Sequence, residues 1–167
     1  MTDPLIQVDA LGKRFQSGGG LFAKPRAMMA VRDVTLTIGK GEVLGVVGES
    51  GCGKSTLARL VLRLIEPSTG RVRFDGTDMT ALPAGALRKL RRRMAMVFQD
   101  PYSSLDPRYN LTDVLAEPFR VQGEAIPTDG IEEMLTAVGL PAALARSHPH
   151  QLSGGQRQRV GIARALA

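Results

Sequence analysis

A run of glycines and small polar residues at positions 48–55 carries the clearest chemical signal in this sequence. The run consists of Gly48, Glu49, Ser50, Gly51, Cys52, Gly53, Lys54 and Ser55. Its spacing matches the phosphate-binding loop G-x-x-x-x-G-K-[ST], whose glycines let backbone N–H groups surround phosphate oxygens. We predict that Lys54 reaches the β- and γ-phosphates of a nucleotide, that Ser55 gives its hydroxyl to Mg²⁺, and that Thr56 makes a second phosphate contact.

A second group of small residues lies at the start of the last predicted helix. It consists of Leu152, Ser153, Gly154, Gly155 and Gln156. Small residues at a helix start leave backbone N–H groups and the Ser153 hydroxyl uncovered, and the helix dipole favours an anion there. One nucleotide rarely needs two such helix starts from one subunit. The pair therefore indicates a dimer that holds nucleotide between its subunits.

The elements around the first loop are those of an α/β protein. The continuous apolar run at 43–47 predicts a strand buried on both faces of a parallel sheet, directly before the loop. At 55–65 the apolar period becomes helical, and a proline two residues later ends the helix. Residues 34–38 and 72–74 alternate as half-buried strands do, and 94–98 is a further apolar strand candidate.

The rest of the chain is predicted to be helical. Apolar residues recur at helical spacing between 131 and 138, and four prolines punctuate the segment 111–150. A final helix is predicted to begin near Gly155 and to continue to the last residue. We expect three parts: a nucleotide-binding β and P-loop core at 1–110, a helical subdomain at 111–150, and the second small-residue group with its helix at 151–167.

Composition excludes several classes of protein. Hydrophobic residues make up 43% and charged residues 23%, and no apolar run reaches the roughly 18 residues of a membrane span. The first residues have neither the basic region nor the apolar stretch of a secretory signal. Because Cys52 is the only cysteine, no internal disulfide can form, and we expect a cytosolic protein in which Cys52 is a small packing residue of the loop.

The net charge of +6 comes mainly from one short segment. Five basic residues supply it, namely Arg88, Lys89, Arg91, Arg92 and Arg93, and without them the remainder is +1. Clustered charges are usually a solvated surface, and we interpret this cluster as a solvated helix end. A polyanion site is the alternative, although no nucleic-acid partner is expected.

The first loop, Gln99 after an apolar strand, and the run LSGGQRQRVGIARAL at 152–166 occur in this order along the chain. On these residues the chain resembles the ATP-binding subunit of an ABC transporter. The resemblance implies a P-loop NTPase core of the RecA-like type, with an N-terminal antiparallel β part, an inserted helical subdomain and a sheet incomplete at the C-terminus. It also implies ATP and Mg²⁺ as cofactors, and a second ATP-binding subunit, identical or different, as a partner.

The resemblance also assigns roles to single residues. Residues 152–156 match the signature motif LSGGQ, which in the family contacts the γ-phosphate of ATP held by the P-loop of the opposite subunit. Ser153, Gly154 and Gly155 would take that role here. Gln99 matches the glutamine that senses Mg²⁺ and the attacking water and couples the site to the membrane subunit. Lys54 and Gln99 are thus the expected catalytic residues, and Ser55 and Gln99 the expected residues at the metal. Phe15 stands where the family has an aromatic residue that stacks on adenine, with a core phenylalanine as the alternative interpretation.

Further details narrow the resemblance. The loop, the segment 98–108 and the insertion at 18–27 are similar to the ATPase subunits of dipeptide and oligopeptide importers, and nickel importers share much of this pattern. This implies that ATP binding and hydrolysis drive uptake of peptides or a similar small solute. It implies membrane permease partners, contacted through the Gln99 loop and the helical subdomain, and a peripheral position at the cytoplasmic face of the inner membrane. The Pro-, Ser- and Asp-rich stretch 100–110 is expected to be a mobile connection.

The sequence departs from the family pattern at its C-terminal end. The Walker B strand with its Mg²⁺-binding Asp and its Glu, the D-loop and the switch histidine are expected beyond Ala167. We therefore expect these 167 residues to be the first part of such an ATPase, with negligible hydrolysis on their own. His148 and His150 precede the signature motif and are interpreted as loop residues.

The sequence leaves three alternative functions open. A small P-loop kinase would use residues 94–98 as its Walker B strand and Asp100 as its Mg²⁺ ligand, but it leaves the signature motif unexplained. An ABC-type ATPase acting on nucleic acid or ribosomes would use the basic cluster at 88–93. A nucleotide-binding remnant would keep the phosphate contacts without hydrolysis.

Overall fold

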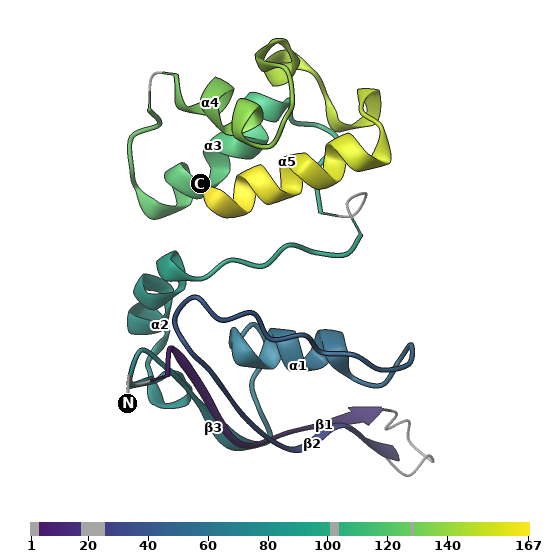
Figure 1. Ribbon diagram of the computed structural model, residues 1–167, viewed down its shortest axis with the longest axis vertical. Helices are drawn as coiled ribbons and strands as arrows, with labels where there is room; N and C mark the ends of the chain where they lie inside the picture. Colours follow the sequence, from purple (N-terminus) through teal and green to yellow (C-terminus); the bar gives the residue numbers. More distant parts are fainter. Residues whose placement is uncertain (1–3, 18–25, 101–103, 128) are drawn as a thin grey trace, which may run out of the picture. The chain divides into compact units, whose positions relative to one another are not determined.

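The computed structural model describes residues 4–17, 26–100, 104–127 and 129–167. The chain forms two compact units, Met1–Arg91 and Arg92–Ala167 (Figure 1). Each unit has its own buried apolar residues. Most of the predicted insertion at 18–27 lies outside the described residues. The functional boundary expected after residue 110 stays a prediction.

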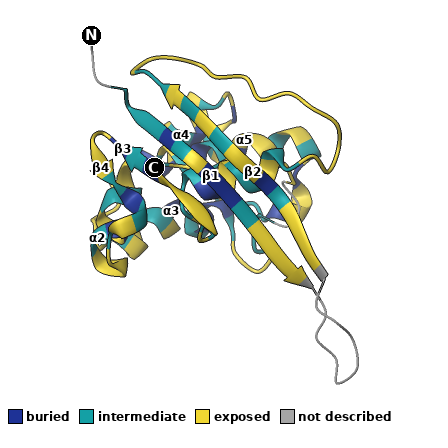
Figure 2. Ribbon diagram, turned by 90° about the horizontal axis from the view of Figure 1, so that it is seen from below, coloured by how far each residue is buried: buried dark blue, intermediate teal, exposed yellow. Residues whose placement is uncertain are grey.

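The first unit is built on a four-stranded antiparallel sheet with the order β2-β1-β3-β4. Its strands are β1 (Ile6–Ser17), β2 (Arg26–Ile38), β3 (Thr69–Phe74) and β4 (Thr77–Asp78). Val8 of β1 lies opposite Val72 of β3, and both side chains are buried, because side chains directly opposite in neighbouring strands share one face. Figure 2 shows that buried positions in β1 and β2 occupy only short stretches of these strands. The antiparallel β part is thus confirmed.

Short helices contribute further apolar side chains to this unit. They are α1 (Lys54–Val61), η1 (Met79–Ala81) and α2 (Ala84–Leu90), and the turn η2 (Arg91–Arg93) follows at the boundary. Leu60, Met79 and Leu87 are each buried, one from each helix. The buried residue of α1 is Leu60, whereas the apolar stripe predicted for this helix is only half-buried at Leu57 and Val61 and is exposed at Leu64.

Helix α1 ends earlier than the helix predicted at 55–65. Arg63 adopts a left-handed φ of 49°, and its guanidinium donates to the carbonyl oxygens of Met79 and Leu82, the latter at 2.8 Å. The Arg91 guanidinium donates in turn to the carbonyl oxygen of Arg63. These tertiary hydrogen bonds end the helix at Val61, and helical periodicity alone does not reveal them.

The two apolar strands predicted at 43–47 and 94–98 are not formed. Neither run pairs with another strand among the described residues, and Val43 and Val47 are each 93% exposed. A strand of a parallel sheet is stable only with neighbours that satisfy its backbone groups and cover its faces. The described residues supply no such neighbours, so apolar composition alone does not form these strands, and the parallel part of the sheet is incomplete.

The second unit is helical, as predicted. Its elements are α3 (Leu111–Gln122), α4 (Gly130–Ala137), η3 (Ala142–Arg146), η4 (Pro149–Gln151) and α5 (Gly154–Leu166). Asn110 caps α3 by accepting a hydrogen bond from the Asp113 N–H at 2.9 Å, and Gly123 ends it with a φ of 72°.

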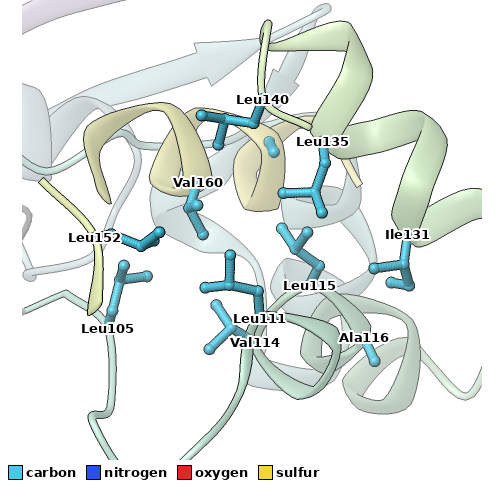
Figure 3. Close-up of a cluster of buried hydrophobic side chains, with 11 residues drawn as sticks. Leu105, Leu111, Val114, Leu115, Ala116, Ile131, Leu135, Leu140, Leu152 and Val160 are labelled. Atoms are coloured by element: carbon cyan, nitrogen blue, oxygen red, sulfur yellow. The ribbon is translucent and has the colours of Figure 1, made fainter. Parts of the chain in front are cut away.

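One apolar cluster holds the second unit together (Figure 3). Leu111, Val114 and Leu115 of α3 meet Ile131 and Leu135 of α4 and Val160 and Ala163 of α5. Three residues outside these helices, Leu105, Leu140 and Leu152, complete it. The helical stripe predicted at 131–138 therefore packs inward, with Met134 and Val138 partly buried at its edge.

Candidate nucleotide-binding site

The glycine-rich loop leads into α1 without regular secondary structure. Its residues from Glu42 to Cys52 are exposed. The Cys52 N–H donates to the Glu49 carbonyl oxygen at 3.4 Å, and the Leu57 N–H donates to the Gly53 carbonyl oxygen at 2.8 Å, which begins the helix. The first turn of α1 contains no acidic residue. The positive end of the helix dipole therefore meets no carboxylate from its own turn, which suits an anion.

Two glycines of the loop have conformations that other residues adopt poorly. Gly51 has a φ of 81°, and Gly53, the N-cap of α1, has a φ of 99°. At Gly53 there is also no room for a side chain, because a Cβ would lie 2.4 Å from the carbonyl oxygen of Ala30 in β2. The loop can keep this shape only with glycine at position 53.

The ammonium group of Lys54 lies inside the loop. Its Nζ donates to the carbonyl oxygens of Gly48 at 2.7 Å and Glu49 at 2.6 Å, and lies 3.6 Å from Sγ of Cys52. The positive charge is therefore held at the centre of the loop by backbone oxygens. Phosphate oxygens would compete well for the same donors, because a hydrogen bond between two charged groups is stronger than one to a neutral carbonyl.

Ser55 and Thr56 follow in the first turn of α1. The Ser55 side chain is exposed and Thr56 is half-buried. Among the described residues, no group of three or more His, Cys, Asp and Glu side chains gathers at one place. A single hydroxyl together with phosphate oxygens and water is a donor set that Mg²⁺ accepts, and Ser55 fits that set.

Phe15 lies near the end of β1 in the same unit as the loop. It is paired with Met28 of β2, and its side chain is 38% exposed. The Lys13 ammonium lies 5.2 Å from the centre of the Phe15 ring and donates to the Glu66 carbonyl oxygen at 2.6 Å. Phe15 is thus not a core residue. The cation occupies one face of its ring, and stacking on adenine stays a prediction for the other.

The signature residues begin α5 with a reciprocal pair of hydrogen bonds. The Ser153 Oγ accepts from the Gln156 N–H at 3.3 Å, and the Ser153 N–H donates to Oε1 of Gln156 at 2.9 Å. The side-chain oxygen Oε1 of Gln156 is thus committed to the helix cap. Leu152 is buried in the apolar cluster, and a Cβ at Gly155 would meet nothing within 4 Å. The first-turn backbone of α5 is therefore anchored by Leu152 and open at Gly155.

Gln99 belongs to the second unit, as the signature does, and its side chain is exposed. It follows the run 94–98, in which Val97 and Phe98 are exposed as well. The structure therefore brings the loop residues 48–56 together in the first unit and leaves the roles predicted for Gln99 and for the signature residues as predictions.

The segment after Gln99 contains interactions that the sequence analysis missed. We expected 100–110 to be a mobile connection, and residues 101–103 lie outside the described residues. The part from Ser104 onward is anchored instead. Leu105 is only 3% exposed, and Nη1 of Arg164 in α5 donates to the Ser104 carbonyl oxygen at 2.7 Å. A contact 60 positions apart in sequence has no local signal.

An ion pair shapes the same segment. The Asp106 carboxylate accepts from the Arg108 guanidinium at 2.6 Å and from the Arg108 backbone N–H at 3.0 Å. These hydrogen bonds lower the pKa of Asp106 to about 2. The spacing Asp-Pro-Arg is a turn signal that could have indicated this pair.

Two residues of the basic cluster at 88–93 donate hydrogen bonds to backbone carbonyl oxygens. Arg91 donates to the carbonyl oxygen of Arg63, within the first unit. Arg92 pairs with Glu124 at 3.1 Å and donates to the Gln122 carbonyl oxygen at 2.7 Å, within the second unit. These two charges hold backbone segments in place, which weakens the argument for a polyanion site; that the chain binds no nucleic acid stays a prediction.

Comparisons with known proteins agree with this geometry. The family described as ABC transporter matches residues 31–167. The chain belongs to the ABC transporter family. A probable peptide ABC transporter ATP-binding protein of Sinorhizobium fredii, y4tS, is 49% identical over 100% of this chain and 48% of its own length. The oligopeptide transport ATP-binding protein AppF of Bacillus subtilis is 43% identical over 98% of this chain and 51% of its own length. The chain thus spans about half the length of these relatives.

Solved structures of ATP-binding cassettes have the same fold. A dimeric post-hydrolysis state of the cassette MJ0796, bound to ADP and Pi, matches with a TM-score of 0.84 and 31% identity, over 97% of this chain and 69% of that one. The family and the fold that the loop and the signature motif predicted are therefore confirmed. The family match leaves the small-kinase alternative without support. Among the described residues, no helix is long and apolar enough to cross a membrane.

Proposed function

We propose that this chain supplies the ATP-binding part of an ABC importer that takes up peptides or a similar small solute. The observation that carries the proposal is the Lys54 ammonium held inside a glycine loop at the start of α1, since this is a phosphate-binding arrangement. Support for the solute comes from relatives named as peptide and oligopeptide transport proteins. Peptide uptake would place the chain at the cytoplasmic face of the inner membrane, bound to permease subunits.

In this function each part of the loop has a separate task. The backbone N–H groups at the start of α1 bind phosphate oxygens, and Lys54 exchanges its two carbonyl partners for oxygens of the β- and γ-phosphates. Ser55 would hold Mg²⁺ through its hydroxyl. The ion, when bound, neutralises phosphate charge. Phe15 supplies a half-exposed ring for the base.

The signature residues would act on a second subunit. Ser153 and the open backbone at Gly155 offer donors at the start of a 13-residue helix, which suits a γ-phosphate presented by another copy or a related subunit. The dimeric cassette MJ0796 supports an arrangement of two ATP-binding subunits. Because the Gln156 side chain caps the helix, the donors proposed for phosphate are the Ser153 hydroxyl and the backbone N–H groups of Gly154 and Gly155.

Hydrolysis needs carboxylates as well as donors. A catalytic site of this kind uses one acid on the metal and a second group that orients the attacking water. The sequence contains no Asp-Glu pair after an apolar run. We therefore expect these 167 residues to bind ATP but to hydrolyse it at close to the uncatalysed rate.

The test of the ATP-binding proposal is an equilibrium titration of the full-length protein with ATP. Lys54→Ala removes the charge inside the loop, and the affinity should fall at least about tenfold, or about 1.4 kcal/mol. Lys40→Ala is the matched control, because Lys40 is an exposed lysine of the same unit that pairs only loosely with Asp75, at 3.7 Å. Equal affinities for the two variants would remove the loop assignment.

A further inference from the structure

One face of the Phe15 ring is covered by a charged side chain of the same strand. The Lys13 ammonium lies 5.2 Å from the centre of the ring. A cation over the face of an aromatic ring is attracted by the negative charge of that face, and the contact favours one orientation of the ring. Phe15 is nevertheless 38% exposed, so part of the ring remains accessible to another partner.

The ammonium that covers the ring is itself fixed. Nζ of Lys13 donates to the Glu66 carbonyl oxygen at 2.6 Å. The Glu66 side chain is held in turn, because Nε of Arg63 donates to both of its carboxylate oxygens at 3.1 Å. The Arg63 guanidinium also donates to the carbonyl oxygens of Met79 and Leu82. The carbonyl group that binds Lys13 therefore belongs to an anchored segment.

The backbone of β1 is fastened to the same segment. The Ser68 N–H donates to the Gly12 carbonyl oxygen at 2.8 Å, and the Arg14 N–H donates to Oγ of Ser68 at 3.0 Å. Together with the bond from Lys13, these contacts tie residues 12–14 to residues 66–68. The backbone contacts thus set where Phe15 lies, and Lys13 sets how its ring is turned.

The ring lies a short distance along the sheet from the phosphate loop. Lys13 is paired with Val31 of β2, and a Cβ at Gly53 in the loop would lie 3.6 Å from Cγ2 of Val31. Phe15 is paired with Met28, which is three positions from Val31 along the same strand and is 62% exposed. At about 3.3 Å per residue this separation is about 10 Å. A ribose and its first phosphate can bridge such a distance, so one nucleotide can reach both the ring and the loop.

We propose that Lys13 is a positioning residue for the nucleotide base, because its ammonium covers one face of the Phe15 ring and leaves the other face set for stacking. This inference rests on the proposed function, since it takes the ligand of the loop to be ATP. A ring that is held in place before the ligand arrives loses little freedom on binding. Without the ammonium, the two side-chain torsions of Phe15 become freer, and part of the stacking free energy is spent on ordering the ring.

The experiment compares ATP with inorganic tripolyphosphate, which carries the three phosphates without ribose or base. Both ligands are titrated, with Mg²⁺ present, into the full-length protein and its Lys13→Met variant, which keeps most of the alkyl stem and loses the ammonium. The ATP affinity of the variant should fall about threefold, the effect of one cation–π contact at an exposed site. Its tripolyphosphate affinity should stay at the wild-type value. Damage to the loop, or a weaker attraction of the phosphates by the protein's charge, would lower both affinities.

The neighbouring cation on β1 provides a matched control. Arg14→Met removes one positive charge from the same strand, whereas the Arg14 contact with Ser68 runs through the backbone N–H and survives. This variant should keep the wild-type ratio of ATP to tripolyphosphate affinity. Lys13→Arg keeps a cation that can cover the ring and donate to Glu66, and it should bind ATP as the wild type does.

A double-mutant cycle tests whether Lys13 acts through the ring. In a protein that already carries Phe15→Leu, Lys13→Met should cause no further loss of ATP affinity, because the ring that it positions is gone.

Three results overturn the inference: an unchanged ATP affinity in Lys13→Met, an equal fall for ATP and tripolyphosphate, or a full effect of Lys13→Met beside Phe15→Leu. If Lys13→Met does not fold, Lys13→Gln takes its place and the same results decide. A wild type that binds neither ligand refutes the proposed function instead. A wild type that binds both ligands equally leaves the loop assignment intact and overturns the role of Lys13.

Discussion

Gly53 is seated against the carbonyl oxygen of Ala30, so closely that a Cβ at Gly53 would lie 2.4 Å from that oxygen. Ala30 belongs to β2, whereas Gly53 is the N-cap of α1. The shape of the phosphate loop is therefore set partly by the antiparallel sheet of the same unit. The glycines allow the left-handed backbone conformation of the loop, and β2 leaves no room for a side chain at position 53.

Gly53→Ala should therefore destabilise the protein much more than Gly51→Ala. Both positions have a left-handed φ, which costs a residue with a side chain about 1–2 kcal/mol. Only Gly53 adds the collision with the Ala30 oxygen, and we expect a total loss of about 3 kcal/mol or more. Urea unfolding of the two variants measures the difference. Equal losses would mean that the loop and β2 are not packed in this way.

Substitutions of the capping residue Ser153 can test helix stability and phosphate binding separately. Ser153→Ala removes the acceptor for the Gln156 N–H and should cost about 1 kcal/mol of stability. Ser153→Asp restores an acceptor at the cap and should keep the stability, but it places a negative charge where the γ-phosphate is proposed to bind.

We therefore expect Ser153→Asp to unfold at the wild-type denaturant concentration and to lose ATP-dependent dimerisation, as measured by light scattering with and without ATP. An ATP-induced dimer of normal affinity in this variant would contradict phosphate binding at the start of α5. A loss of stability equal to that of Ser153→Ala would contradict the cap instead.

The Asp106–Arg108 ion pair predicts that the Asp106 carboxyl group titrates at low pH. The pKa of Asp106 is lowered from 3.8 to about 2, mainly by the side-chain hydrogen bond from Arg108 and then by the Arg108 backbone N–H. A carboxyl with a lowered folded-state pKa contributes stability above the unfolded-state value of 3.8, and this contribution is lost as the pH falls toward 2. NMR titration should find the Asp106 midpoint near 2 in wild type and closer to 3.8 in Arg108→Met. A wild-type midpoint near 3.8 would show that the pair does not form in solution.

The parts of the site that depend on short sequence spacing were predictable. The loop glycines, Lys54 at the start of α1 and the cap at Ser153 are all set by residues within a few positions of one another. The helical character of 111–150 was predictable for the same reason, because its apolar residues repeat at the helical period and pack into one cluster.

Contacts between distant segments were not predictable from patterns. The Arg63 guanidinium bonds to carbonyl oxygens of Met79 and Leu82, and these bonds end α1 before the predicted position. Arg164 reaches Ser104 across 60 positions, and no local pattern marks either residue. The strand predicted at 43–47 is absent for a different reason. The composition of this run suits a buried strand, but no described residue pairs with it.

The last prediction concerns Gln99, which is exposed and lies in the same unit as the signature. If Gln99 couples the phosphate site to the permease, Gln99→Ala in the assembled transporter should weaken stimulation of ATPase activity more than it weakens ATP binding. The reason is that the amide acts on the metal and water during turnover, whereas the loop around Lys54 supplies the binding. Gln122→Ala is a suitable control, because the Gln122 contact with Arg92 runs through its backbone carbonyl oxygen and survives the substitution. Stimulation and ATP affinity should be measured in one preparation. If Gln99→Ala keeps full stimulation, or loses both in equal proportion, the amide does not carry the coupling.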